Sequence, residues 1–303
     1  MRYFSSFAGV GGMELLFPKE WELVAYSEWD KYASMVHKFH TPNVQNYGDI
    51  SKIKWERVSD FDMLTGGTPC QNFSIAGKRE GISGDKSKLV WEFIRCLKEK
   101  KPRYFIFENV KGLLSSRGGF DFANILTAFS EERYDLWWQV LNAKYFGVPQ
   151  NRERIFVVGS RITSPREVFF ERENSKTIVE VSRTIRNGGR GSVDGKHTWD
   201  IIKVLNKGES QHYLLYEEKG IAPNLVGSVG MSSQKHPFIK KGFRVRKLMP
   251  VECERLMGWS NNWTKWGINE KGEKVEISDS QRYRQCGNGC VPQCVKWIVE
   301  NVL

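Results

Sequence analysis

A cysteine in a glycine- and proline-containing stretch has the clearest chemical potential in this sequence. Residues 66–74 (Gly-Gly-Thr-Pro-Cys-Gln-Asn-Phe-Ser) follow a short apolar run, residues 61–64, that predicts a buried strand. The glycines and the proline predict a sharp turn after that strand. Since α/β proteins place nucleophiles on such loops, Cys70 is a candidate nucleophile. A small, buried structural cysteine is the alternative.

A carboxylate and two arginines follow later predicted strands. Glu108 ends the apolar run 104–107, so we expect it at the same sheet edge as Cys70. Arg152 and Arg154 alternate within residues 150–154 (Gln-Asn-Arg-Glu-Arg), which would place both guanidinium groups on one strand face, suited to an anion. The alternative for Glu108 is a carboxylate that caps a helix or a turn. The alternative for the two arginines is a salt-bridged surface strand.

The first residues predict a turn that approaches a ligand. Residues 1–7 predict a strand, and residues 13–17 predict the start of a helix. Between them lies Ala-Gly-Val-Gly-Gly, with Gly9, Gly11 and Gly12. A strand, a glycine turn and a helix bring bare backbone N–H groups close to a bound molecule.

Three side chains after the next strands suit a nucleoside. Glu28 could accept hydrogen bonds from both ribose hydroxyls, or be a charge at a helix N-terminus. Trp29 offers a flat face to adenine, or belongs to the core. Asp49 could accept a hydrogen bond from the adenine amino group, or cap a turn. The glycine turn lacks the full GxGxxG pattern and no Walker lysine is present, which favours adenosylmethionine, a nucleoside without phosphates, over NAD.

Composition and charge bound the class of protein. The chain has 303 residues and a formal net charge of +11, which favours a polyanionic partner. Residues 161–250 contain 17 Lys or Arg and 9 Asp or Glu, so they are the candidate nucleic-acid surface. Without an apolar run that could span a bilayer or the pattern of a signal peptide, we expect a cytoplasmic protein with reduced cysteines. Cys286, Cys290 and Cys294 recur every fourth residue, which predicts helix packing rather than a metal site.

Together these motifs resemble, in order, the DNA (cytosine-5)-methyltransferase family of bacterial and phage modification enzymes. Residues 4–12, 28–29 and 48–50 are similar to the cofactor motifs, and residues 67–74 to the catalytic motif. Residues 108–110 match the ENV motif, 150–154 the QxRxR motif, 246–259 the ninth motif and 285–291 the last. The last motif usually reads GNSV, whereas Gly289 stands here in place of the serine.

The resemblance implies an α/β fold: a Rossmann-like, adenosylmethionine-dependent methyltransferase sheet with a smaller, irregular target-recognition domain. Residues 1–160, completed by 280–303, would form the catalytic domain, and residues 161–279 the target-recognition domain. The implied activity is methyl transfer from S-adenosylmethionine to carbon 5 of a flipped-out cytosine in double-stranded DNA, through a covalent Cys70 adduct. A cognate restriction endonuclease and a monomeric state are further expectations.

The resemblance also assigns residues to roles. The catalytic set is Cys70, Glu108, Arg152 and Arg154. The cofactor set is Phe7, Gly9, Gly11, Gly12, Glu28, Trp29, Asp49, Ile50, Pro69, Leu89 and Asn288. The DNA-binding set is Gln71, Ser74 and Lys78 in the loop after the catalytic cysteine, and Arg183, Arg186 and Arg190 in the basic segment.

Other functions remain open on the sequence alone. An RNA cytosine methyltransferase would use the same motifs. A nicotinamide dehydrogenase would give Cys70 and Glu108 no role and would need a better glycine fingerprint. A DNA-binding relic without activity is disfavoured, because the nucleophile, the carboxylate and the arginines are all present.

Overall fold

The computed structural model describes residues 1–69, 88–162, 215–217, 225, 238–241 and 244–303. Cys70 and most of the basic segment 161–250 lie outside these ranges. Side chains of 215–217, 238–241 and 244–247 are likewise outside the description.

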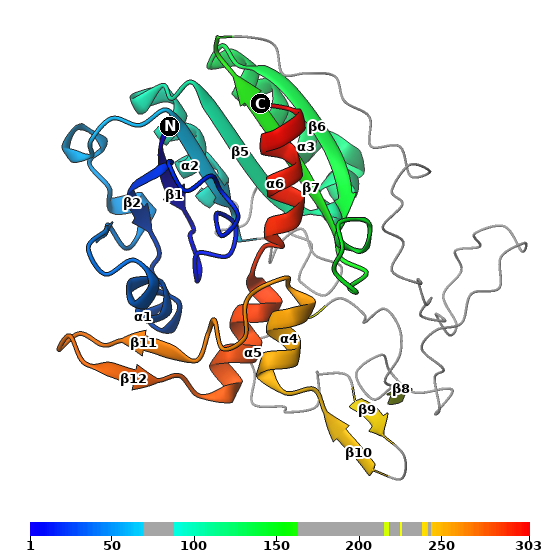
Figure 1. Cartoon of the computed structure of the whole chain (residues 1–303). Coiled ribbons are helices and arrows are strands. Elements are labelled where there is room, and N and C mark those ends of the chain that lie inside the picture. The colour runs from blue at the N-terminus through cyan, green and yellow to red at the C-terminus, as the bar shows by residue number, and fades with distance from the viewer. Residues whose placement is uncertain (70–87, 163–214, 218–224, 226–237, 242–243) are drawn as a thin grey trace, which may run out of the picture.

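A seven-stranded sheet forms the centre of the molecule, with strand order β3-β2-β1-β4-β5-β7-β6 (Figure 1). The strands from β3 to β5 run parallel, and β7 is antiparallel to both of its neighbours. Their bounds are β1 Arg2–Ser6, β2 Glu22–Ser27, β3 Gln45–Asn46, β4 Met63–Gly67, β5 Tyr104–Val110, β6 Asp135–Asn142 and β7 Glu153–Ser160. This mixed sheet confirms the predicted α/β class.

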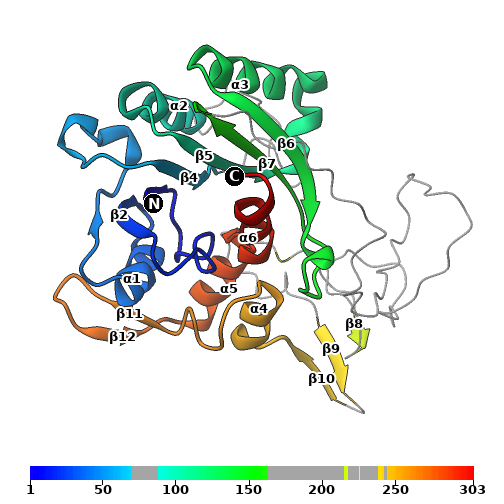
Figure 2. The same ribbon diagram turned by 45° about the horizontal axis from the view of Figure 1, so that its top comes forward.

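Alternating side chains of the sheet build two separate cores. Phe4, Leu64 and Phe105 point to one face, which α2 (Lys88–Lys100) and α3 (Phe120–Glu131) cover. Their neighbours Tyr3 and Met63 point to the other face, which α1 (Lys31–His40) and α6 (Pro292–Asn301) cover (Figure 2). Burial on both faces explains why the strands read as nearly continuous apolar runs.

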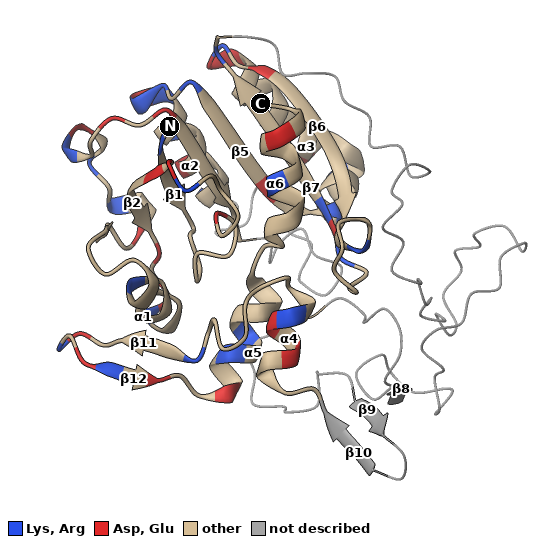
Figure 3. Cartoon of the chain, in the orientation of Figure 1, with Lys and Arg blue, Asp and Glu red and all other residues tan. Residues whose placement is uncertain are grey.

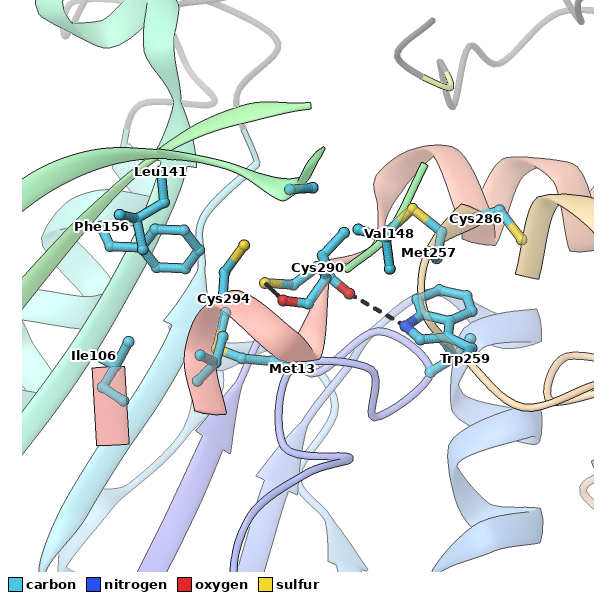
Figure 4. Packing of buried hydrophobic residues seen from close by; sticks show 14 of the residues in the cluster. Met13, Ile106, Leu141, Val148, Phe156, Met257, Trp259, Cys286, Cys290 and Cys294 are labelled. Atoms are coloured by element: carbon cyan, nitrogen blue, oxygen red, sulfur yellow. Dashed lines mark hydrogen bonds between the residues drawn. The ribbon is translucent and has the colours of Figure 1, made fainter. Parts of the chain in front are cut away.

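The helix α6 packs against the central sheet (Figure 1). After α5 (Asp279–Asn288) the chain passes into α6, whose Val295 and Ile298 are fully buried against the sheet. Cys286, Cys290 and Cys294 are buried in the same core (Figure 4). Their burial agrees with the helix-packing interpretation. Within the described ranges no group of residues could hold a metal ion.

A smaller part of the chain lies beside the sheet. It contains β8 (Leu215–Glu217), β9 (Phe238–Lys241), β10 (Arg244–Lys247), α4 (Pro250–Leu256) and the hairpin β11 (Trp266–Ile268) and β12 (Lys274–Glu276). Short 3-10 turns cover Ile50–Lys52, Trp55–Arg57, Lys111–Gly119 and Ala143–Tyr145. Charges of both signs occur on α4 and α5 (Figure 3), and Arg284 of α5 pairs with Asp30 before α1 at 3.1 Å.

The expected helix at residues 13–17 is absent: the structure has turns there. Only five residues lie between Gly12 and Pro18. A residue before proline avoids the helical region, and the few residues left cannot offset the entropy of starting a helix. The segment therefore folds back directly towards β2.

Candidate active site

Glu108 lies at the carboxyl end of β5, directly beside Gly67 of β4. A Cβ added to Gly67 would lie 2.7 Å from Glu108 Oε2, so the carboxylate occupies the space of the missing side chain. Asn109 holds the next residue of the loop, because its Nδ2 donates to Thr68 Oγ1 at 2.9 Å. Cys70 follows three residues after Gly67, a span of at most about 11 Å.

Glu108 forms an ion pair with Arg154 at the beginning of β7. Arg154 Nε lies 3.0 Å from Glu108 Oε1, and the two side chains are only 13% and 12% exposed. Burial raises the pKa of the Glu108 carboxyl, while the positive charges of Arg154 and Arg152 oppose that rise. The carboxyl group therefore takes up a proton more readily than an exposed glutamate.

The position of Arg152 differs from the prediction. The sequence predicted that Arg152 and Arg154 face an anion from one strand. It lies just before β7 and is 2% exposed. Its Nη2 donates to Gly287 O at 3.1 Å and to Gly289 O at 2.5 Å, and its Nη1 donates to Leu225 O at 3.3 Å. Arg152 thus ties the end of α5 and Leu225 to the rim of the sheet.

The glycine turn after β1 contains three residues with a positive φ. Phe7, Gly9 and Gly11 have φ of 51°, 55° and 75°. A positive φ is rare for phenylalanine and clusters at functional sites. Glycine meets the same requirement without steric cost.

Side chains from three other segments hold this turn in place. Glu28 Oε2 accepts a hydrogen bond from Gly9 N at 2.8 Å, and Trp263 Nε1 donates to Val10 O at 3.0 Å. His37 Nδ1 lies 3.4 Å from Gly9 O and stacks on Tyr26. Burial lowers the pKa of His37 to about 4, so the imidazole is neutral at pH 7.

A small cleft, partly open to solvent, connects the glycine turn with Glu108. Its lining combines the ends of β1 and β4, the turn and the end of α5: Ser5, Ser6, Phe7, Ala8, Gly9, Val10, Gly12, Met13, Glu14, Gly67, Glu108, Asn288, Gly289 and Cys290. A ligand at the turn would therefore have one end beside the carboxylate.

Glu28, Trp29 and Asp49, which the sequence predicts for the adenosine, are not among the residues that line the cleft. Glu28 accepts backbone N–H groups of Gly9 and Asp30, one on each oxygen, and a carboxylate oxygen has a further lone pair for a hydroxyl. Trp29 is 76% exposed, which excludes a core role and leaves its ring face available. Asp49 caps the turn at Ile50, since it accepts hydrogen bonds from Ser51 N and Oγ.

The other expected cofactor residues differ in exposure. Ile50 is 3% exposed and belongs to the core, whereas Asn288 is exposed and lines the cleft. Leu89 is half-buried in the first turn of α2, and Pro69 is half-buried at the edge of the described range. Seven expected residues lie outside the description, namely Cys70, Gln71, Ser74, Lys78, Arg183, Arg186 and Arg190.

Sequence reasoning did not single out Glu14, a buried carboxyl group of the cleft. Its Oε1 accepts the hydroxyls of Thr65, at 2.8 Å, and of Ser5. Burial raises the pKa of Glu14 despite these hydrogen bonds. The signal was a single acidic residue within the apolar stretch 13–17.

In the described ranges, no helix is long and apolar enough to cross a membrane.

The sheet order defines the fold as the α/β fold of S-adenosylmethionine-dependent methyltransferases. Residues 1–303 match the family described as C-5 cytosine-specific DNA methylase, and the chain belongs to that family. It is thus a DNA (cytosine-5-)-methyltransferase, and its methyl donor is S-adenosylmethionine.

Related sequences are methyltransferases of bacteria and their phages. The type II methyltransferase M.Bsp6I of Bacillus sp. is 31% identical over 98% of this chain and 97% of its own length. M.SsoII of Shigella sonnei is 31% identical over 100% of this chain and 80% of its own. The orphan methyltransferase M.Rho11sI of Bacillus phage rho11s is 34% identical over 92% of this chain, which spans 56% of that longer protein.

Solved structures share the fold. The Entamoeba histolytica methyltransferase EhMeth matches with a TM-score of 0.70 at 14% identity, covering 99% of this chain and 97% of that one. The S. pombe Dnmt2 methyltransferase matches with a TM-score of 0.68 at 17% identity over the same shares. At such identities the likeness concerns the fold alone.

Proposed function

We propose that this enzyme methylates carbon 5 of a flipped-out cytosine within a specific double-stranded DNA sequence, through a covalent adduct with Cys70. One observation carries the proposal: a single cleft joins the strained glycine turn to the Glu108 carboxyl group. Cys70 is three residues after Gly67, which lines this cleft.

The chemistry follows from the weak nucleophilicity of cytosine carbon 5. The Cys70 thiolate adds to carbon 6 and forms a carbon–sulfur bond, while Glu108 shares its proton with ring nitrogen 3. Carbon 5 thereby gains enamine character. S-adenosylmethionine, when bound, supplies the methyl group. Loss of the carbon 5 proton to a base, cleavage of the carbon–sulfur bond and return of the proton to Glu108 complete the cycle.

The raised pKa of Glu108 supports its part in this scheme, because a carboxyl group must hold a proton to share it with nitrogen 3. Arg154 fixes the carboxylate through the ion pair at 3.0 Å and brings positive charge to the rim of the cleft. Such charge favours a thiolate over a thiol, whose ordinary pKa is about 8.5. We propose a positioning role for Arg152, since its guanidinium binds backbone carbonyls.

The cofactor assignment rests on the shape and donors of the cleft. Glu28 would receive the ribose hydroxyls, Trp29 would stack on adenine and Asp49 would accept from its amino group. Phe7, the glycines of the turn and Asn288 would line the methionine end near Glu108. Ile50, Pro69 and Leu89 would complete the apolar surround.

A duplex substrate requires that the target base leave the helix, at a cost of roughly a few kcal/mol. We propose that Gln71, Ser74 and Lys78 contact the extruded nucleotide, and that Arg183, Arg186 and Arg190 contact DNA in a target-recognition domain of residues 161–279. Residues 280–303 would complete the catalytic domain 1–160, in keeping with the packing of α6. RNA is less favoured, since the family is described as a DNA methylase family.

Bisulfite sequencing of DNA from cells that express the protein tests the proposal. We expect methylated cytosines at one short sequence, and no methylation with Cys70→Ser, which should still bind duplex DNA. Methyl transfer by Cys70→Ser would refute the covalent route, and methylation confined to RNA would refute the substrate. A partner endonuclease, a monomeric state and a cytoplasmic location stay predictions.

A further inference from the structure

Two glycines that are far apart in the sequence contact the same indole ring. A Cβ added to Gly12 would lie 2.6 Å from Trp259 Cζ2, and a Cβ added to Gly289 would lie 2.4 Å from the same atom. Real Cβ atoms essentially never show contacts below 3.0 Å. Neither position accepts a side chain while the indole keeps its place.

The requirement for glycine at position 289 is steric. Its φ of −76° and ψ of 172° are open to any residue, so backbone freedom does not explain the glycine. The indole is also difficult to displace. Trp259 is 4% exposed, and its Nε1 donates to Cys290 O at 3.2 Å (Figure 4).

The two glycines form parts of the wall of the cleft. Gly12 belongs to the glycine turn and Gly289 to the end of α5, and both line the cleft together with Asn288. The indole of Trp259 lies against both segments, within the buried core that also contains Val10 and Cys290. Trp259 therefore fixes the separation of two segments that would contact the methionine end of the cofactor.

We propose that Trp259 is a positioning residue for cofactor binding, and that Gly289 is a glycine because the indole fills the volume of a side chain there. The proposal rests on the assignment of this cleft to S-adenosylmethionine. It also accounts for the departure of the last motif, in which Gly289 replaces the usual serine: a serine Cβ would overlap Trp259.

Calorimetric binding of S-adenosylmethionine without DNA tests the proposal on Gly289→Ser, Trp259→Phe and the double variant. The serine should weaken binding about tenfold, because an extra side chain in a packed site forces its neighbours apart. Phenylalanine lacks the outer ring atoms that meet position 289 and should weaken binding severalfold on its own. The double variant should bind more tightly than Gly289→Ser, since the shorter ring makes room for the hydroxymethyl group.

The thermal midpoint of each variant tests whether the fold is intact. Glu28→Ala is the reference variant for the assignment of the cleft to S-adenosylmethionine, and it should weaken binding of this cofactor. The role of Trp259 would be overturned if Gly289→Ser bound S-adenosylmethionine with wild-type affinity. It would also be overturned if the loss of affinity in the double variant were the product of the two single losses. In both cases a loss of affinity in Glu28→Ala would still support the cleft as the cofactor site. Unchanged binding in Glu28→Ala would overturn the cleft assignment and the inference with it.

Discussion

Gly67 and Glu108 face each other across β4 and β5, and the carboxylate of Glu108 lies where a side chain of residue 67 would begin. The glycine therefore leaves room for the position in which this carboxyl group lines the cleft while paired with Arg154. The relationship gives a direct test of the role of Glu108.

Gly67→Ala should lower kcat by about 100-fold, on the scale of a lost positioned proton donor, with little change in thermal stability. A Cβ at 2.7 Å from Oε2 displaces the end of a flexible side chain, which costs little folding energy but moves the carboxylate. Steady-state methylation measures kcat. If Glu108 mediates the effect, Gly67→Ala in a Glu108→Gln background should cost nothing further; an additional 100-fold loss would contradict it.

Arg154→Ala should raise the pKa of Glu108, because the guanidinium at 3.0 Å favours the ionised carboxylate. The alkaline limb of the kcat/KM profile should therefore move to higher pH, while the maximal rate falls at least tenfold through lost positioning. Lys111→Ala is the control, since it removes only the exposed pair with Glu153 at 3.0 Å. If the alkaline limb stays at the same pH, the group that causes this limb is not Glu108.

Arg152→Lys should act mainly on the affinity for S-adenosylmethionine and on stability. The lysine cannot reproduce the hydrogen bonds to Gly287 O, Gly289 O and Leu225 O, and unsatisfied buried groups cost about 1–3 kcal/mol. We expect a raised KM for the cofactor with kcat at saturation within about threefold of wild type. A loss confined to kcat would instead indicate a catalytic role.

Trp29→Ala should weaken cofactor binding about tenfold and leave the thermal midpoint unchanged, since the ring is 76% exposed. Trp29→Phe should recover most of the affinity. Phe120→Ala is a matched control, because Phe120 is also an exposed aromatic residue, at 70%. Equal effects of both alanine variants on binding would exclude a stacking role for Trp29.

Glu14→Gln should change how stability depends on pH. Burial raises the pKa of Glu14 above its ordinary 4.5, so the folded state binds more protons than the unfolded state between those two values. Stability from this group is therefore present at low pH and falls as pH rises through that window. The variant should gain thermal stability relative to wild type at pH 8 compared with pH 5, whereas exposed Glu131→Gln should not.

The sequence predicted the parts of the site that depend on strand ends. Glu108 follows a buried run, so its place at the sheet edge could be derived from the rule for parallel strands. The prediction of a helix at residues 13–17 was wrong, because Pro18 leaves too few residues to form a stable helix. The contact of Trp259 with Gly12 and Gly289 could not be derived, since it depends on how backbone segments meet after folding. Arg152 shows the same limit: its alternation with Arg154 says nothing of the carbonyls that it binds.

The position of α6 has a consequence for synthesis of the protein. Val295 and Ile298 cover a face of a sheet whose strands end at residue 160. A ribosome adds about 5–20 residues per second, so that face waits on the order of 10 s for its cover. During this interval the nascent chain presents aliphatic surface, and a stop codon shortly before α6 would make the uncovered state permanent. Chaperone dependence and proteolytic loss of such truncated products follow from a helix that is translated well after the strands it covers.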